Sequence, residues 1–342
     1  MITSTLYLYT ETPLHAGVGS GLSSIDLPIQ RERTTQYPMV QSSGIKGKLR
    51  SALEGSRDNL TPAARDMVDI VFGPPSTSGG GSEHAGALIA GDARILLFPV
   101  RSLNGVFAYT TSYDILNRFK RDIEREPNAP KLNWTIPEAV KDQVLVTTSS
   151  EVHYDNTIVL EEFSFDTRAD KQVDTIANWI AQKALPNLGT DYWPNKVKTS
   201  LAILPNDVFR DFVLHATEVI TRIRIDREKK TVDKGALWTE EHLPSDTLLY
   251  VPLYATKGRK KASQVTEQQV LDQVKALNNT YLQLGGDETV GRQEDQQPRL
   301  FFPLQHHRSE VQPEPGGGGA RSGSKGRQGG VSLPQRRLQH RV

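Results

Sequence analysis

The residues best suited to chemistry on a phosphate group lie near the N-terminus, in residues 12–50. His15 precedes a turn with glycines at positions 17, 19 and 21, and backbone N–H groups in such a turn can approach an anion closely. Asp26 follows, and a basic segment then begins with Ser43 and carries Lys46, Lys48 and Arg50. These residue types favour phosphate as the ligand.

Asp26 is the unexpected member of this group, because a carboxylate repels phosphate unless it holds a metal ion or handles a proton. An aspartate before Leu27 and Pro28 is otherwise typical of a turn or cap. His15 is either an ordinary loop histidine or an acid, a base or a hydrogen-bond donor, because imidazole titrates near neutral pH. The combination indicates chemistry on a phosphodiester.

A helix that starts near Ser43 must position the basic residues. Apolar residues at positions 45, 49, 52 and 53 have helical spacing, and Ser43 is predicted as the N-cap. Lys46 and Arg50 then share a different face, four residues apart. This face is either an ordinary solvated surface or, with exposed helix N–H groups beside it, a phosphate site.

The same segment resembles the N-terminal signature of the RAMP proteins, in the branch that forms the backbone subunit of type III-B CRISPR effector (Cmr) complexes. The resemblance rests on TPLHxGxGxxxxxIDLPIQRE followed by YPxxxxSxIKGxLR. Further matches follow in order within residues 2–292: FGP from Phe72, DAR from Asp92, LFPVRS from Leu97, RIRID from Arg222, GALW from Gly235 and GGDETVGR from Gly285.

The resemblance implies that Asp26 is required for cleavage of a target RNA. Asp26 would hold a divalent cation, Mg²⁺ or Mn²⁺, or help to deprotonate a ribose 2′-hydroxyl, which attacks the adjacent phosphorus in line and expels the 5′-oxygen. A lone carboxylate makes a weak metal site, so RNA phosphates would have to complete the coordination. His15 is the second catalytic candidate.

Two further motifs carry candidate site residues. The acidic pair Glu240 and Glu241 follows GALW and is either a solvated pair on a hairpin or a source of a supporting catalytic carboxylate. The glycines after residue 284 either end a helix or, by the resemblance, contact RNA. The residues expected to bind guide RNA are Ser43, Lys46, Lys48, Arg50, Gly285, Gly286, Gly291 and Arg292.

Strand and helix patterns interleave along the chain, which is typical of an α+β fold. The resemblance implies a ferredoxin-like, RRM-type fold (palm) with inserted helical segments and a projecting β-hairpin (thumb). A hairpin between residues 144–146 and 158–165 has long polar connections suited to that projection. Other strands are expected at 5–10, 95–98, 105–109, 201–204, 219–225 and 247–254, and helices at 112–123, 173–185, 208–213 and 265–284.

Composition limits the possible functions. The chain has 342 residues and no cysteine, so disulfides, thiolate metal sites and a cysteine nucleophile are excluded. No apolar run could span a membrane, and the N-terminus does not resemble a signal peptide, so a cytoplasmic location without membrane contact is expected. Before residue 315 there are 35 basic and 40 acidic residues, a balance of −5, so RNA binding must rest on local basic patches.

The sequence changes character after Arg292. Residues 1–292 are predicted to form one RAMP domain with insertions, and residues 293–342 a disordered tail rich in glycine and arginine. The tail is either a genuine appendage that touches RNA or the product of a reading-frame change. Residues 300–302 could add one short strand.

The resulting hypothesis is a backbone subunit of a CRISPR ribonucleoprotein that binds guide RNA along a filament and cleaves complementary target RNA at regular intervals. The expected partners are guide RNA, target RNA, further copies of the chain and the other Cmr subunits. Two alternatives remain. One is a guide-binding scaffold without nuclease activity, and the other is a metal-independent ribonuclease that processes guide RNA through His15.

Overall fold

The computed structural model describes residues 1–21, 24–75, 84–125, 131–186, 189–225, 232–278, 281–285 and 300–301. Residues 1–305 form one compact unit, and the second unit, residues 306–342, lies outside the described residues. The predicted boundary after Arg292 also lies outside them. The rest of this description concerns the first unit.

Four strands at one side of a large mixed sheet form the centre of this unit. They are β1 (Ile2–Tyr9), β4 (Ala93–Arg101), β12 (Leu248–Ala255) and β13 (Leu300–Phe301), and all their pairings are antiparallel. Their order in the sheet is β13-β1-β12-β4. β12 is a nearly continuous apolar run because both of its faces are covered.

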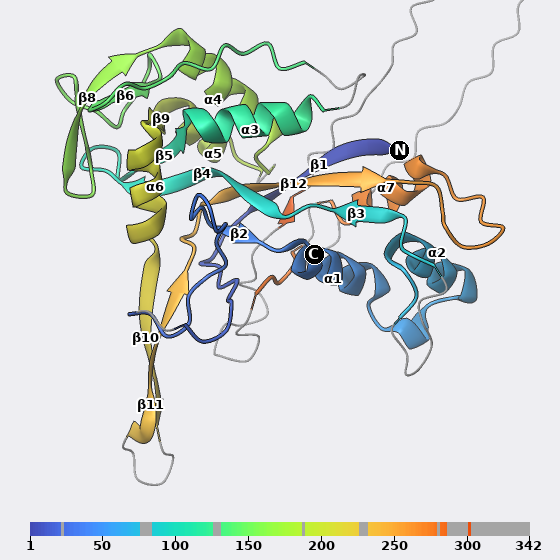
Figure 1. The fold of residues 1–342 in the computed structure, drawn as a ribbon. Coiled ribbons are helices and arrows are strands. Elements are labelled where there is room, and N and C mark those ends of the chain that lie inside the picture. Colours follow the sequence, from blue (N-terminus) through green and yellow to red (C-terminus); the bar gives the residue numbers. More distant parts are fainter. Residues whose placement is uncertain are drawn as a thin grey trace, which may run out of the picture. The chain divides into compact units, whose positions relative to one another are not determined.

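Helices cover both faces of these strands. α1 (Ser42–Glu54) follows β1, and α7 (Glu267–Lys275) follows β12 and packs beside α1. α3 (Tyr113–Ile123) lies on the opposite side of the strands from α1 (Figure 1). With α1 and α7 included, the central elements have the chain order β1-α1-β4-β12-α7-β13.

The core between the strands and α3 is aromatic. Tyr7 of β1 stands opposite Tyr250 of β12, and the ring of Phe119 lies 6.2 Å and 5.0 Å from theirs. Trp134 and Trp179 close the cluster, at 6.0 Å and 5.6 Å from Phe119. Phe119 is fully buried at the centre of this cluster.

The sheet continues beyond β4 through β5-β9-β6-β8-β7. The predicted hairpin between residues 144–146 and 158–165 is wrong, because β6 pairs with β8 in parallel and with β9 antiparallel. The tight hairpin is β7 with β8. Their bounds are β5 (Phe107–Ser112), β6 (Gln143–Val146), β7 (Thr157–Leu160), β8 (Phe163–Ala169) and β9 (Leu201–Leu204).

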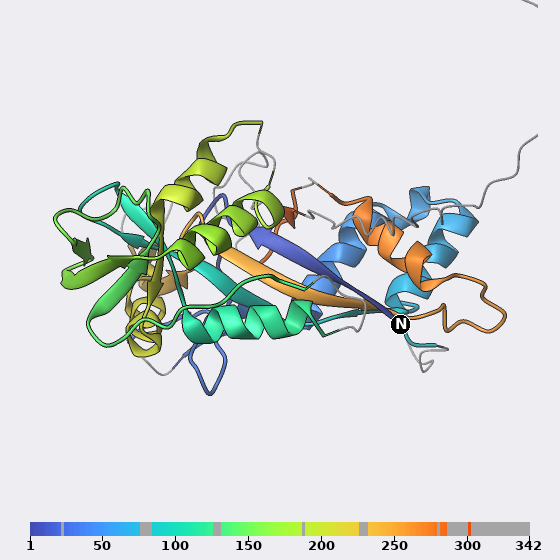
Figure 2. The same cartoon turned by 90° about the horizontal axis from the view of Figure 1, so that it is seen from above.

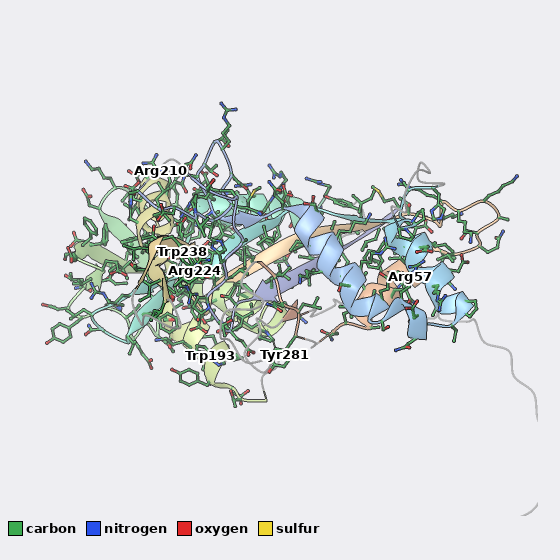
Figure 3. The ribbon with its side chains drawn as sticks, turned by 90° about the horizontal axis from the view of Figure 1, so that it is seen from below. Arg57, Trp193, Arg210, Arg224, Trp238 and Tyr281 are labelled. Atoms are coloured by element: carbon green, nitrogen blue, oxygen red, sulfur yellow. The ribbon has the colours of Figure 1, made fainter. Side chains whose placement is uncertain are left out.

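A separate two-stranded hairpin projects from the sheet (Figure 1). It consists of β10 (Glu218–Ile225) and β11 (Val232–His242), paired antiparallel with a register shift between Ile223 and Ile225. The predicted strand at 219–225 is confirmed, but the projection lies here and not at residues 144–165. Figure 3 labels one residue of each strand, Arg224 of β10 and Trp238 of β11.

The remaining elements frame these two parts. Figure 2 shows α2 beside α1 and α7, and the helices α4 to α6 gathered around the other part of the sheet. Residues 57–59 form a 3₁₀ turn before α2. The bounds of the remaining helices and strands are α2 (Pro62–Phe72), α4 (Lys171–Lys183), α5 (Tyr192–Ser200), α6 (Asn206–His215), β2 (Met39–Val40) and β3 (Leu88–Ala90).

Several predicted boundaries shift for local reasons. Ser112 does cap α3, where its side chain accepts a hydrogen bond from the Ile115 N–H. Ser43 is not an N-cap, because α1 begins at Ser42 after Gln41. α5 includes Pro194 at its third position. Proline is tolerated there because the N–H groups of the first helical turn have no hydrogen-bond partner within the helix. The helix predicted at 265–284 is only α7, nine residues long.

Phe119→Ala should destabilise the protein by about 3–5 kcal/mol, because it empties the centre of the aromatic cluster. Phe163→Ala is the matched control, since Phe163 is 61% exposed, and it should cost about 1 kcal/mol or less. Chemical denaturation followed by circular dichroism measures both. Equal losses of unfolding free energy in the two variants would mean that the aromatic cluster does not contribute more to stability than an exposed ring does.

Candidate functional site

The base of β11 holds the N-terminal loop that contains the predicted catalytic residues. One edge of β11 pairs with β10, and the other edge receives two segments of the loop. Leu27 exchanges hydrogen bonds with the backbone of Thr239 and Glu241, and Leu14 pairs with Leu243. The loop is therefore built into the sheet at the foot of the hairpin.

Asp26 is exposed at this position, and its carboxylate is fixed by one residue. Thr239 donates to Oδ2 from its backbone N–H at 2.8 Å and from its hydroxyl at 3.0 Å. The Thr239 hydroxyl also accepts from the Asp26 N–H. Donation from the Thr239 backbone, and then from its hydroxyl, lowers the pKa of Asp26, so the group is an anion at neutral pH.

His15 reaches the same edge of β11 through its side chain. Its Nδ1 lies 2.7 Å from the carbonyl oxygen of Glu241, which can only accept, so Nδ1 carries the proton. In the neutral ring, Nε2 is then the basic nitrogen. A Cβ atom on Gly17 would stand 2.6 Å from this Nε2, so the glycine leaves room for the ring.

Asp26 and His15 are anchored two residues apart on β11, at Thr239 and at Glu241. With a rise of about 3.4 Å per residue, their anchor points lie roughly 7 Å apart along one strand edge. The buried ring of His242 lies 5.3 Å from the His15 ring. The structure thus brings together the two predicted catalytic residues from opposite ends of the glycine turn.

Glu241 is buried, with only 3% of its surface exposed, and its carboxylate is fully occupied. Oε1 accepts from Arg31 at 2.5 Å and from the Thr217 hydroxyl at 2.8 Å, and Oε2 accepts from the Ile29 N–H at 3.0 Å. Arg31 also donates to the carbonyls of Gln36 and Val213. These bonds fasten the loop after Asp26 to β11 and α6.

Glu240 is 4% exposed and faces the hairpin. It accepts from the indole N–H of Trp238 at 2.7 Å and from Arg222 at 3.0 Å. His242 Nε2 lies 3.5 Å from the same carboxylate. The expectation that Glu240 and Glu241 form a solvated pair is therefore wrong, and both carboxylates are directed at protein donors.

The described residues do not form a metal site of their own. Within the described ranges, no three histidine or acidic side chains are grouped as metal ligands. Asp26 Oδ2 is occupied by Thr239, so among the described residues Oδ1 of Asp26 is the carboxylate oxygen that the site presents. One oxygen is too few for Mg²⁺ or Mn²⁺, so protein groups alone do not fit a resident cation.

A shallow groove of about 480 Å³ lies between the N-terminal loop, at Ala16 and Gly17, and α1. Gly17 and Gln30 line one wall, and Leu284 and Gly285 contribute the segment after α7. The wall from α1 consists of Ser43, Gly44, Gly47, Lys48 and Ser51. Two segments predicted to bind RNA, at α1 and at Gly285, thus meet the glycine turn, which was predicted to approach an anion, in one groove.

Gly285 has a conformation that this position requires. Its φ is +93°, and a Cβ atom would lie 2.2 Å from the carbonyl oxygen of His15. Any other residue would push this segment away from His15. Gly286, Gly291 and Arg292, the other predicted members of this loop, lie outside the described residues.

The other two basic residues of α1 lie outside this groove. Arg50 donates to Glu54, to Asp69 and to the carbonyl oxygen of Gly73, and so ties α1 to α2. The prediction that Arg50 shares an outward phosphate-binding face with Lys46 does not fit these bonds. Lys46 lines a different pocket, beside Ala85 and Arg259.

Comparison with known proteins identifies the family of this chain. Residues 7–292 match the RAMP superfamily, and the chain belongs to this superfamily. It is 40% identical over 287 residues to the CRISPR system Cmr endoribonuclease Cmr4 of Pyrococcus furiosus, covering 83% of this chain and 91% of that protein. It is 26% identical to the CMR subunit Cmr4 of Saccharolobus solfataricus, covering 85% and 97%.

Solved structures agree with this relationship. Oligomeric Cmr4 from Pyrococcus furiosus has a TM-score of 0.64 and 33% identity, covering 88% of this chain and 96% of that one. A chain in type III-B Cmr-beta bound to cognate target RNA has a TM-score of 0.63 at 21% identity, which shows a shared fold. Among the described residues no helix is long and apolar enough to span a membrane.

Sequence reasoning missed Thr239 and Arg31. Thr239 lies 213 residues from Asp26, and no local pattern connects the two. Arg31 belongs to the same motif as Asp26, but its partner Glu241 lies 210 residues away. The one indication in the sequence was that Arg31 lies in IDLPIQRE and Thr239 directly follows GALW, and both motifs belong to the same family resemblance.

Thr239→Val should raise the pKa of Asp26 toward its ordinary value, because it removes one of the two donors to Oδ2. Those donors stabilise the fold above pH 3.8, and their contribution is lost as the pH falls through the lowered pKa. Carboxyl ¹³C NMR titration measures the change. Thr221→Val, opposite Thr239 on β10, is the control, and an equal shift in both variants would contradict this assignment.

Proposed function

We propose that the chain is the backbone subunit of a CRISPR RNA-guided ribonucleoprotein of type III-B and that it cleaves target RNA. The observation that carries this proposal is the exposed carboxylate of Asp26, fixed by Thr239 at the foot of a projecting hairpin, with His15 anchored two residues further along the same strand edge. The 40% identical relative is named an endoribonuclease, which supports it. A cytoplasmic location accords with this function.

The finer fold assignment belongs to the same proposal. The strand order β13-β1-β12-β4, with α1 and α7 as the two crossovers, supports a ferredoxin-like palm of β-α-β-β-α-β type. Residues 102–247 would then be one long insertion between its second and third strands. The hairpin β10–β11 would be the thumb.

Guide RNA is proposed to bind in the groove between α1 and Gly285. Ser43 offers a hydroxyl, Lys48 offers a cation, and the glycines at 17, 44, 47 and 285 allow a sugar–phosphate backbone to approach closely. Such contacts go to phosphates and carry no sequence information. Base pairing with the target would supply specificity, as in other guided systems.

The hairpin suits a role on the duplex between guide and target. Val219, Ile223 and Leu237 expose at least half of their surfaces to solvent. Apolar side chains of this kind can interrupt base stacking. A displaced nucleotide could reach the in-line geometry that cleavage needs. Further copies of the chain, stacked along the guide with the other Cmr subunits, would repeat the cut at regular spacing.

The chemistry divides between the two candidate residues. His15 Nε2 would accept the proton of the 2′-hydroxyl, whose oxygen then forms a bond to phosphorus while the bond to the 5′-oxygen breaks. The products would be a 2′,3′-cyclic phosphate and a 5′-hydroxyl, whose oxygen takes a proton from water. Asp26 has too low a pKa to be an efficient base at neutral pH. Its fixed charge would instead orient the hydroxyl and favour the imidazolium that forms. Glu240 and Glu241 would position β11 and take no proton.

Asp26→Asn should leave assembly and guide binding intact and reduce cleavage of target RNA by roughly 10²-fold or more, since it removes the charge and keeps the shape. The measurement is cleavage by the reconstituted complex. Asp166→Asn, at an exposed position on β8, is the control. Unchanged cleavage would favour the alternative, a guide-binding scaffold without nuclease activity.

A divalent cation is proposed to enter with the RNA, whose phosphates would supply most of its ligands beside Asp26 Oδ1. The isolated chain should then show no Mn²⁺ binding in a calorimetric titration, whereas EDTA should stop cleavage by the complex. Cleavage that persists in EDTA, with processing of precursor RNA by the isolated chain, would instead support a metal-independent ribonuclease acting through His15.

A further inference from the structure

A second pocket, of about 340 Å³, lies on the other side of the first turns of α1. Lys46 and Arg259 line it together with Ser42 and Ser43, and the rest of its lining is apolar or glycine. None of its lining residues is acidic. Ser43 also lines the groove that carries Lys48, so the two hollows share a rim.

Neither cation in this pocket forms an ion pair with a residue that the structure describes. Within the described residues, the ammonium group of Lys46 makes no hydrogen bond and no ion pair, although the side chain is only partly exposed. Arg259 donates only to the hydroxyl of Thr256, at 3.3 Å, through Nε. Its two terminal nitrogens, which form the fork that suits phosphate, remain unused by the described residues.

This arrangement disfavours the positive charge of Lys46, while Arg259 is exposed to solvent. Burial, and then the charges of Arg259 and Arg50, lower the pKa of Lys46. The neighbouring basic residues differ, because Arg50 and Arg57 each pair with Glu54 and Asp69. The chain thus neutralises Arg50 and Arg57, whereas Lys46 and Arg259 have no acidic partner among the described residues.

We propose that Lys46, Arg259 and Ser43 form a second phosphate subsite for single-stranded RNA. The RNA strand would cross the first turns of α1, with one phosphate beside Lys48 in the groove and another between Lys46 and Arg259. This inference rests on the proposed function, and it adds Arg259, a residue that no RNA-binding motif in the sequence marked.

The test measures binding of a short uridine oligomer to the full-length chain by fluorescence anisotropy at several salt concentrations. Lys46→Met and Arg259→Met keep the length of the side chain and remove its charge. Each should weaken binding roughly tenfold and reduce the slope of log affinity against log salt by about 0.7. Lys261→Met, which removes an exposed charge outside the pocket, should change affinity less than about twofold.

Lys48→Met separates this inference from the proposed function. If Lys48→Met weakens binding while Lys46→Met and Arg259→Met behave like Lys261→Met, the subsite is wrong and the groove stands. If only the variants of Lys46 and Arg259 weaken binding, the subsite stands and the groove assignment fails. If none of these variants weakens binding, both are wrong.

Thermal unfolding provides a second readout that a purely structural lysine would not give. Lys46→Met should keep or raise the melting temperature, because it removes an ammonium group that has no acceptor among the described residues. A fall typical of a broken ion pair would overturn the proposal. Inorganic phosphate that stabilises the wild type but not Lys46→Met, without any effect of that variant on RNA binding, would show a site for the free anion and would also overturn it.

Discussion

The arrangement of the site depends on the buried ion pair between Arg31 and Glu241. The charged atoms of this pair come from segments 210 residues apart, and 13% of the arginine side chain and 3% of the glutamate side chain are exposed. A buried pair costs desolvation free energy, and it is tolerated when additional hydrogen bonds satisfy its remaining atoms. Here Thr217, Ile29, Gln36 and Val213 supply them. The pair therefore fixes the register between the N-terminal loop and β11.

That register decides which groups remain available for chemistry. Both acidic residues of β11 turn toward protein donors, and so Asp26, from the loop, is the carboxylate that this edge presents to solvent. Its low pKa comes from the hydrogen bonds of Thr239, because no basic side chain bonds to it in the described part of the chain. A carboxylate held by neutral donors keeps its full charge toward a ligand. The cations that would attract RNA lie apart, along α1.

α1 shows how one helix separates its basic residues by spacing. Ile45 and Leu49 face the core, and Arg50, one position further, is drawn into the ion pairs that join α1 to α2. Lys48 lies on the groove side and Lys46 on the opposite side, because two residues correspond to about 200° around a helix. The two lysines therefore line two separate hollows. Gly44 and Gly47 have no side chains, so the surface of α1 between the two lysines carries little bulk.

The sequence by itself determined the class of fold, the family and the segment that contains Asp26, His15 and the basic helix, because these follow from local spacing and from an ordered series of motifs. It also determined the chemistry open to those residues. The tertiary structure decided which of them share a surface. It buried Glu240 and Glu241, directed Arg50 inward, shortened the helix before Gly285 and placed the projecting hairpin at β10–β11. The contacts that hold the site depend on partners far away in the chain, such as Thr239 for Asp26 and Arg31 for Glu241. No local pattern encodes a contact between residues more than two hundred positions apart.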